Sequence, residues 1–306
     1  MVTTDRITDV KTRHDFLFLF DVQDGNPNGD PDAGNMPRVD PETMQGLVTD
    51  VCIKRKVRNY VDMVGGDKER TKIYVQDKGI ALNTLHQRAY TSCSIKPTGS
   101  KQKREEVDKT RAWMCANFYD IRVFGAVMTT EVNCGQVRGP VQLTFARSVD
   151  QIVPLDVSIT RVAVTRPEDA EVSVTETGEA EGLGKRTEMG RKAVLPYGLY
   201  LGRGFFSPKF AKDTGATSED LALFWEALQR MWDLDRSSSR GFMSLRGLYV
   251  FTHENPLGNA PSHELFERVR VARKDGVDAA RSFDDHVVTV DDQNLPAGVT
   301  LTRVVG

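Results

Sequence analysis

The sequence has few of the features that mark several common protein classes. It has 306 residues but only four cysteines, and no two of these form a CxxC pair. A zinc knuckle, a redox motif and a disulfide framework are therefore not expected. The five histidines show neither an HExxH motif nor a His/Cys ligand spacing, so no metal site and no cofactor are predicted.

Long apolar runs are also missing. The longest, Phe16 to Phe20, has the length of a strand and falls far short of the roughly 20 residues that span a bilayer. Residues 1–12 are polar and charged and lack the apolar stretch of a signal peptide. We therefore expect a cytoplasmic protein with no membrane partner.

Motifs of nucleophilic or nucleotide chemistry are absent as well. The sequence contains neither G-x-S-x-G nor the phosphate-binding GxxxxGK[ST] pattern. Its 41 basic and 43 acidic residues give a net charge of −2. Because this balance does not indicate a nucleic-acid binder, any such site has to be a local basic patch on an otherwise acidic chain.

The composition is that of an ordinary globular protein, with 39% hydrophobic and 27% charged residues. Two segments are predicted from clear patterns: a buried strand at Asp15–Val22, and a helix that begins at the Asp40 cap and ends at Gly65. Further strands are predicted at Tyr119–Val127, Val141–Phe145, Leu155–Thr165, Val194–Phe206 and Leu245–His253, and further helices at Ser218–Asp233 and Ser262–Arg270.

Without its insertions, the predicted order is strand, helix, strand, strand, helix, strand. This α+β order is that of the ferredoxin-like fold, which also includes the RNA-recognition motif (RRM). We predict a single domain over residues 13–306 with a helical insertion at 67–115 and a protruding loop at 166–192. The loop is acidic first and basic later. Large insertions on a small domain are where function usually lies.

The loop between Asp24 and Asp40 is rich in Asp, Asn, Gly and Pro. Its beginning imitates a calcium loop, but the twelfth position is Asn35 where such a loop needs a bidentate Glu. The favoured interpretation is a turn in which Asp and Asn side chains bond their own backbone. A metal or catalytic role for Asp24, Asp30 or Asp32 is the alternative.

Several basic stretches are candidates for binding phosphates. Lys54 and Arg58 stand one turn apart on the predicted helix, where they either follow a phosphate backbone or only solvate an exposed face. Gly135–Gly139 carries Arg138 between two glycines, which suits either phosphate approach or a hairpin turn. Two more basic, glycine-containing stretches are Gly184–Lys192 and Arg236–Arg246.

Four segments together resemble a known family: Phe16–Pro31 (FLFLFDVQDGNPNGDP), Gly135–Val141 (GQVRGPV), Glu188–Gly204 (EMGRKAVLPYGLYLGRG) and Ser239–His253 (SRGFMSLRGLYVFTH). They are similar to the Csd-type backbone subunit of the type I-C CRISPR interference complex, Cascade, in the RAMP superfamily. The resemblance covers nearly the whole chain. It implies an RRM-like palm, with the first insertion forming helical fingers and the protruding loop forming a thumb.

The resemblance implies a role without catalysis. Copies of the chain would line up along one CRISPR RNA, grip its backbone and present its bases to target DNA, while a separate enzyme cuts. Base pairing then reads the sequence, and the protein reads backbone and shape. The implied partners are CRISPR RNA, target DNA, further copies of the chain and the cap, large and small Cascade subunits.

The RNA-binding residues that we predict have a basic or amide side chain and lie in the loop after the first strand, in the predicted helix or in one of the basic, glycine-containing stretches. They are Asn26, Asn28, Lys54, Arg55, Arg58, Gln136, Arg138, Lys185, Arg186, Arg191, Lys192, Arg240 and Arg246. No catalytic and no metal-binding residue is predicted. The alternative function is a metal-dependent endoribonuclease that acts on target or precursor RNA, and its only support is the acidic loop and scattered histidines such as His14.

Overall fold

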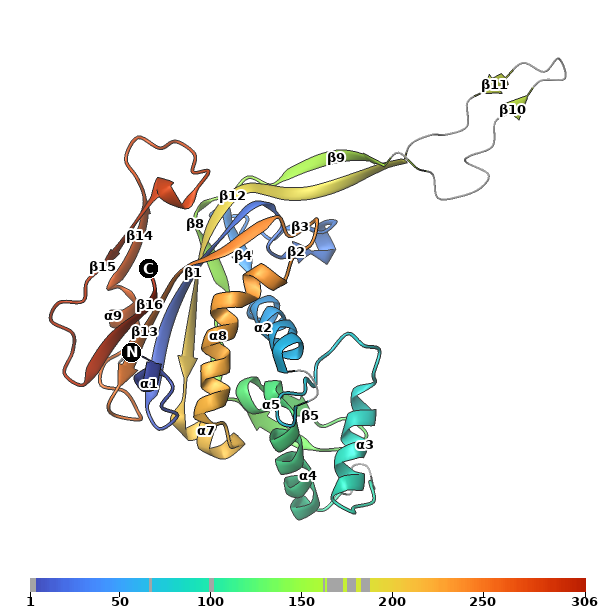
Figure 1. Cartoon of the computed structure of the whole chain (residues 1–306), viewed down its shortest axis with the longest axis vertical. Coiled ribbons are helices and arrows are strands. Elements are labelled where there is room, and N and C mark those ends of the chain that lie inside the picture. Colours follow the sequence, from blue (N-terminus) through green and yellow to red (C-terminus); the bar gives the residue numbers. More distant parts are fainter. Residues whose placement is uncertain are drawn as a thin grey trace.

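The computed structural model describes residues 4–65, 68–98, 102–161, 163, 173–174, 180–182 and 188–306. Its main feature is a large antiparallel sheet (Figure 1). The strands follow one another in the order β16 (Val299–Val305), β13 (Phe242–His253), β1 (Arg13–Gly25), β12 (Glu188–Phe206), β8 (Ala146–Gln151) and β4 (Gln45–Val48). Strands β7 (Val141–Leu143) and β9 (Leu155–Arg161) also pair with β12.

The centre of the sheet is β1, as the Phe-rich run predicts. Residues 14–22 are all buried because both faces of this strand are covered. Phe16 and Phe20 pack against Trp225 and Trp232 on one face, with ring centroids 4.9 and 4.5 Å apart. The side chains of alternate residues, such as Leu17, lie in a separate core on the other face.

The glycines of β12 make room for these phenylalanine rings. Gly202 and Gly204 stand opposite Phe18 and Phe16 in the register. A Cβ atom at either glycine would lie about 2 Å from a ring carbon, at 2.2 and 2.1 Å. The strand predicted at Val194–Phe206 is therefore not interrupted by its glycines and extends from Glu188 to Phe206.

Helices cover the phenylalanine face of the sheet (Figure 1). They are α2 (Asp50–Gly65), α7 (Pro208–Thr214) and α8 (Ser218–Leu234). Helix α8 confirms the predicted amphipathic pattern, and its N-cap is Thr217, which forms a capping box with Asp220. The short helix α1 (Thr4–Ile7) places Ile7 in the same core.

The opposite face of the sheet is covered by the C-terminal part of the chain. Helix α9 (Ser262–Phe266) and the hairpin of β14 (Val269–Arg273) and β15 (His286–Val290) pack there, and the turn η3 (Phe283–Asp285) precedes β15. Single-stranded RNA binds to RRM proteins by stacking on this face. Here that face is an apolar core and is closed to bases.

Residues between α2 and β7 form a helical lobe with a core of its own. The lobe consists of α3 (Leu82–Ser92), α4 (Arg104–Asn117), α5 (Tyr119–Phe124) and the hairpin of β5 (Gly125–Met128) and β6 (Gly135–Arg138). It stands beside the sheet and its helices (Figure 1).

A two-stranded arm projects from the body (Figure 1). We define the arm as β9 with residues 188–194 of β12, paired from Leu155↔Val194 to Arg161↔Glu188. Strands β10 (Ser173–Val174) and β11 (Ala180–Gly182) pair with each other farther along the chain. Near the base of the arm, β2 (Gly29–Asp30), η1 (Pro31–Ala33) and β3 (Met36–Pro37) form a small hairpin.

Three predicted elements are wrong in type or in bounds. The helix predicted at Ser262–Arg270 ends at Phe266, and its last two residues belong to β14. The strand predicted at Tyr119–Val127 is the helix α5 followed by the short β5, and all six residues of α5 are buried. The helix predicted to begin at Asp40 begins at Asp50. Asp40 caps a turn instead, accepting hydrogen bonds from the backbone N–H groups of Glu42 and Thr43, and residues 45–48 form β4.

None of the helices in the described ranges combines the length and the apolar character of a bilayer-spanning segment.

Candidate nucleic-acid interface

A pocket of about 470 Å³ opens where the arm leaves the sheet, and we call it the arm-base pocket. Three segments form it: the loop after β1, the arm, and the loop before β13. The residues that line it are Asn26, Ala33, Gly34, Asn35, Met36, Asp156, Arg191, Lys192, Ala193 and Ser239. The structure thus brings Asn26 close to Arg191 and Lys192, which lie more than 160 residues further along the sequence.

Two backbone segments cross closely beside this pocket. The backbone N–H of Asn26 donates to the carbonyl of Ser239 at 2.7 Å. A Cβ atom on Gly25 would lie 2.0 Å from the Arg240 carbonyl oxygen. Gly241 has φ +65°, and a Cβ atom there would lie 2.4 Å from the Gln23 carbonyl oxygen. Glycine is needed at both positions, and the crossing places Arg240 next to the pocket.

Basic side chains predominate around the arm-base pocket. Arg191 is 80% exposed and pairs with Asp156 at 3.1 Å. Arg240 is 31% exposed and its Nε atom lies 3.2 Å from a carboxylate oxygen of Asp235. Lys192 has no ion-pair partner among the described residues. Arginine presents a fork of donors that matches a phosphate, so the pocket suits a nucleic-acid backbone.

The two predicted asparagines have different positions. The Asn28 side-chain oxygen accepts hydrogen bonds from the backbone N–H and the hydroxyl of Thr49, just before α2, so Asn28 fixes the start of that helix. Asn26 donates to the Asn35 carbonyl at 2.7 Å, while its own side-chain oxygen is buried and has no partner among the described residues. Asn26 thus holds the loop after β1 together at the edge of the pocket.

The predicted cations of α2 are held in ion pairs within the chain. Lys54 pairs with Asp50 at 2.9 Å. Arg55 pairs with Asp77 at 2.7 Å. Arg58 is 11% exposed, pairs with Asp120 at 2.8 Å and lies over the Phe124 ring. A phosphate near this helix therefore competes with a carboxylate for each cation.

The acidic loop forms a turn. Asp30 accepts a hydrogen bond from the backbone N–H of Asp32 and lies 3.4 Å from Arg38. Within the described ranges, no group of three His, Cys, Asp or Glu side chains is arranged to hold a metal ion. The turn interpretation of this loop is therefore the one that the geometry supports.

Gln136 and Arg138 lie in a separate groove of about 750 Å³, between the helical lobe and α7. The basic residues of this groove are Arg70, Arg111, Arg138 and Lys212. Arg138 lies over the Phe210 ring, 4.9 Å from its centroid. A Cβ atom on Gly139 would lie 2.2 Å from the Phe124 carbonyl carbon, so this glycine serves the close packing of the hairpin against α5.

Arg246 lies on the sheet face that the C-terminal hairpin covers. Its Nε atom is 2.8 Å from Asp21, a residue of β1, and its guanidinium lies over the Phe283 ring. Tyr197 also donates a hydrogen bond to Asp21. Burial raises the pKa of Asp21, although the nearby Arg246 opposes this. Lys185 and Arg186 are outside the described residues.

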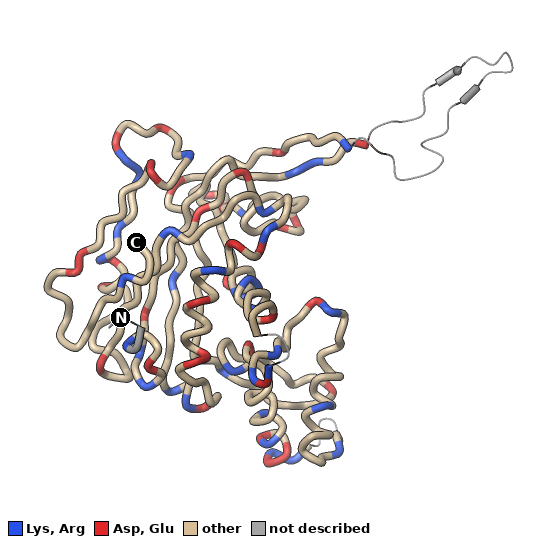
Figure 2. The backbone as a smooth tube through the Cα atoms, viewed as in Figure 1, with Lys and Arg blue, Asp and Glu red and all other residues tan. Residues whose placement is uncertain are grey.

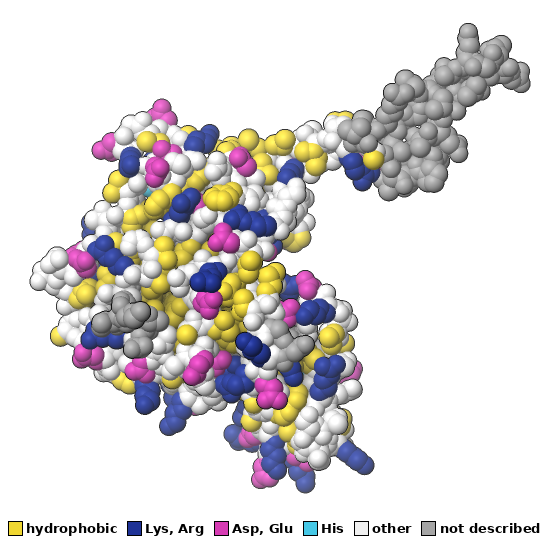
Figure 3. Space-filling model, viewed as in Figure 1, with side chains coloured by type: hydrophobic (Ala, Val, Ile, Leu, Met, Phe, Trp, Pro, Cys, Tyr) yellow, Lys and Arg dark blue, Asp and Glu magenta, His cyan; other side chains and the backbone are white. Residues whose placement is uncertain are grey.

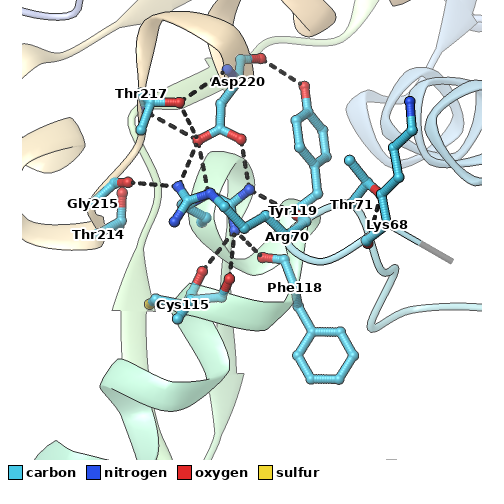
Figure 4. Close-up of polar contacts among 12 residues, drawn as sticks. Lys68, Arg70, Thr71, Cys115, Phe118, Tyr119, Thr214, Gly215, Thr217 and Asp220 are labelled. Carbon is cyan, nitrogen blue, oxygen red and sulfur yellow. Dashed lines mark hydrogen bonds and ion pairs between the residues drawn. The ribbon is translucent and has the colours of Figure 1, made fainter. Parts of the chain in front are cut away.

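A buried ion pair joins the helical lobe to α8. Arg122 has no exposed surface and binds both carboxylate oxygens of Asp220, at 2.8 and 2.6 Å. Its remaining donors reach the carbonyls of Cys115 and Arg70, both at 2.8 Å. Figure 4 shows Asp220 facing the side chain of Arg70. Asp220 also accepts a hydrogen bond from the backbone N–H of Thr217, the N-cap of α8.

No sequence pattern predicted this pair, the position of Ser239 at the arm-base pocket or the contact of Arg38 with Asp30. Arg122 and Asp220 are 98 residues apart, and no local pattern links them. Arg38 was the only one with a signal, because it is the single cation of an acidic loop. Its Nε atom is buried and has no partner among the described residues.

Comparison with known proteins identifies the family. Residues 12–291 match the family model described as CRISPR-associated protein Cas7. The chain therefore belongs to the Cas7 family. A curated relative from Haloferax volcanii, "CRISPR-associated protein Cas7", is 27% identical over 241 residues. This match covers 71% of the chain but only 64% of the length of that relative.

Two solved structures match the chain at low sequence identity. A chain of a "CRISPR RNA-guided surveillance complex, pre-nicking" has a TM-score of 0.48 and 14% identity, and the match covers 78% of each chain. A chain of a "CRISPR RNA-guided surveillance complex" has a TM-score of 0.42 and 14% identity, over 80% of this chain and 73% of that one.

Proposed function

We propose that the chain is a backbone subunit that binds CRISPR RNA without cutting it and polymerises along the guide. The observation that carries this proposal is the arm-base pocket, where Asn26, Arg191 and Lys192 meet beside Arg240. Arginine and lysine side chains on segments held by backbone contacts suit a phosphate–sugar backbone that passes beneath the arm. We assign the subunit to the Csd type of type I-C Cascade, in the cytoplasm.

We further propose that residues 13–306 form one ferredoxin-like palm with two insertions. The strand order β13-β1-β12-β7, with α2 and α8 on one face, supports this interpretation. The insertion at 67–115 would be the fingers, extended by α5 and the β5–β6 hairpin of the helical lobe. The insertion at 166–192, together with the arm, would be the thumb.

The other predicted contacts form four further groups in this proposal. The cations of α2, Lys54, Arg55 and Arg58, would exchange their carboxylate partners for guide phosphates. Gln136 and Arg138 would meet nucleic acid at the groove beside α7. Lys185 and Arg186 would act on the thumb, and Arg246 would support the palm from its covered face through Asp21.

Exposed apolar side chains on the arm are evidence for the proposal that copies of the chain assemble. Leu155, Val157 and Ile159 lie on one face of β9 and are 45, 42 and 47% exposed, and hydrophobic side chains line the arm in Figure 3. Arg191 lies on the other face, beside Asp156 and Ser158, whereas Lys192 stands opposite Val157 on the apolar face. A strand with this alternation normally buries its apolar side. We propose that neighbouring copies, the other Cascade subunits and target DNA complete these surfaces.

Ultraviolet crosslinking of the assembled complex, followed by mass spectrometry of RNA-bound peptides, tests the guide path. We expect crosslinked peptides from 188–193 and from 236–246. Crosslinks confined to other parts of the chain would contradict the arm-base pocket as the guide site.

An assay with complementary RNA and Mg²⁺ or Mn²⁺ tests the absence of catalysis. We expect the RNA to stay intact, because Asp30 is committed to its turn and to Arg38. Evenly spaced cuts that disappear in the Asp30→Ala variant would establish the endoribonuclease alternative.

A further inference from the structure

One carboxylate next to the arm-base pocket is shared by two cations. The same oxygen of Asp235, Oδ2, contacts the Lys56 ammonium and lies 3.2 Å from Nε of Arg240. Asp235 follows the last turn of α8, Lys56 lies on α2, and Arg240 precedes β13. The three side chains therefore tie two helices to the loop that crosses β1 beside the pocket.

The two cations differ in how far their side chains are exposed to solvent. The Lys56 side chain is 1% exposed and lies near the Trp232 ring, 5.9 Å from its centroid. Burial lowers the pKa of Lys56, and the nearby Arg240 lowers it further. A buried ammonium needs its counter-ion, so Lys56 cannot leave Asp235 for a ligand in solvent. Arg240 is 31% exposed and follows Ser239, which lines the pocket.

We propose that Lys56 is a positioning residue for guide binding: by occupying Asp235, it leaves the Arg240 guanidinium available to a phosphate. A carboxylate divided between two cations holds each of them less firmly than it would hold one alone. Without the Lys56 charge, Asp235 would pair with Arg240 alone and hold its guanidinium away from a phosphate. This inference rests on the proposed function, because it assumes that Arg240 contacts RNA.

The test is a mutant cycle with the full chain and a fluorescein-labelled single-stranded RNA of repeat–spacer sequence, measured by anisotropy at several salt concentrations. We expect Lys56→Met to weaken binding about tenfold and to reduce the salt slope by about 0.7, as for one lost phosphate contact. We expect Lys56→Met with Asp235→Asn to restore both, since the net charge is unchanged and Arg240 is released.

A third variant separates positioning from direct contact. In an Arg240→Gln background, which itself weakens binding, Lys56→Met should cause no further loss. The charge-matched control is Arg230→Gln, which removes an exposed cation paired with Glu226 on α8 and should leave binding unchanged. If Lys56→Met alone does not fold, the double variant still gives a result: binding weaker than the wild type would overturn the inference.

The outcomes also distinguish this inference from the proposed function. A loss from Lys56→Met that persists in the Arg240→Gln background would overturn the positioning role and leave RNA binding intact. Arg240→Gln without any effect on affinity or salt slope would remove Arg240 from the guide site. No binding of the RNA by the wild-type chain would contradict the proposed function itself.

Discussion

At the scale of single residues, His14 shows how burial fixes a charge state. Its ring nitrogens lie 3.0 Å from the Thr252 hydroxyl and 3.0 Å from the Asp9 carbonyl. Burial lowers the pKa of His14 from 6.5 to about 4, although the Asp9 carbonyl opposes this. The folded protein therefore holds this histidine neutral at neutral pH.

This pKa predicts a loss of stability in mild acid. Between pH 6.5 and 4 the unfolded chain binds a proton at His14 that the folded chain does not, so the free energy of unfolding falls as the pH falls. The loss amounts to about 3 kcal/mol by pH 4. In urea unfolding at a series of pH values, His14→Gln should remove this part of the slope. An unchanged difference between variant and wild type at pH 7 and pH 4.5 would contradict it.

Arg122 predicts a large effect of a single buried ion pair. Arg122→Ala leaves the buried Asp220 carboxylate with its Thr217 hydrogen bonds and, as its one remaining charged partner among the described residues, Arg70 at 3.3 Å. Breaking such a pair costs about 3–5 kcal/mol, whereas Arg230→Ala breaks an exposed pair and should cost less than about 1 kcal/mol. Urea unfolding of both variants checks this. Equal losses would show that burial of the pair does not matter.

Residue type and spacing alone did not predict which cations are paired with a carboxylate of the same chain. Lys54 and Arg58 have the spacing that follows a phosphate backbone, yet both are paired with carboxylates of the same chain. Asp50 is visible one turn before Lys54, but Asp120 is 62 residues from Arg58 and no local pattern connects them. A sequence pattern reports where charge lies along one helix and cannot report what packs against it.

At the scale of elements, the predictions succeeded where the pattern itself carries the cause. The run at Asp15–Val22 is apolar on both faces because β1 is central, and α8 has an apolar stripe because only one side of it is buried. Helix α5 is buried on every side, so no periodicity separates it from a strand. Strand β4 pairs with β8, about 100 residues away, which no local signal reveals.

The glycine crossing beside the arm-base pocket predicts a matched pair of variants. Gly241 and Gly276 both have positive φ, +65° and +78°, but a Cβ atom at Gly241 would meet the backbone of Gln23 whereas Gly276, between β14 and β15, has open space around it. Gly276→Ala should cost about 1 kcal/mol from conformation alone, and Gly241→Ala clearly more. Urea unfolding and RNA binding together check this, because only Gly241→Ala should also weaken RNA binding.

At the scale of the whole molecule, the candidate site exists only in the folded chain. Basic and acidic residues are interspersed over the body, as Figure 2 shows, and the net charge is −2. Asn26, Lys192 and Arg240 were each predicted from their own motif. Their meeting at one pocket depends on the pairing of β1 with β12 and β13 and on the backbone crossing at Gly25. These are long-range contacts that no sequence pattern specifies.

We propose above that guide RNA runs through the arm-base pocket. The measurement that tests it most directly is the RNA retained by the complex after a high-salt wash, when the chain is expressed with its partner subunits and a CRISPR array. The wild-type complex should retain repeat–spacer RNA of one defined length. This RNA should be lost from the variant with Arg191→Glu and Lys192→Glu and retained by the variant with Arg230→Glu and Lys209→Glu. Equal retention by both pairs, or no RNA in the wild-type complex, would contradict it.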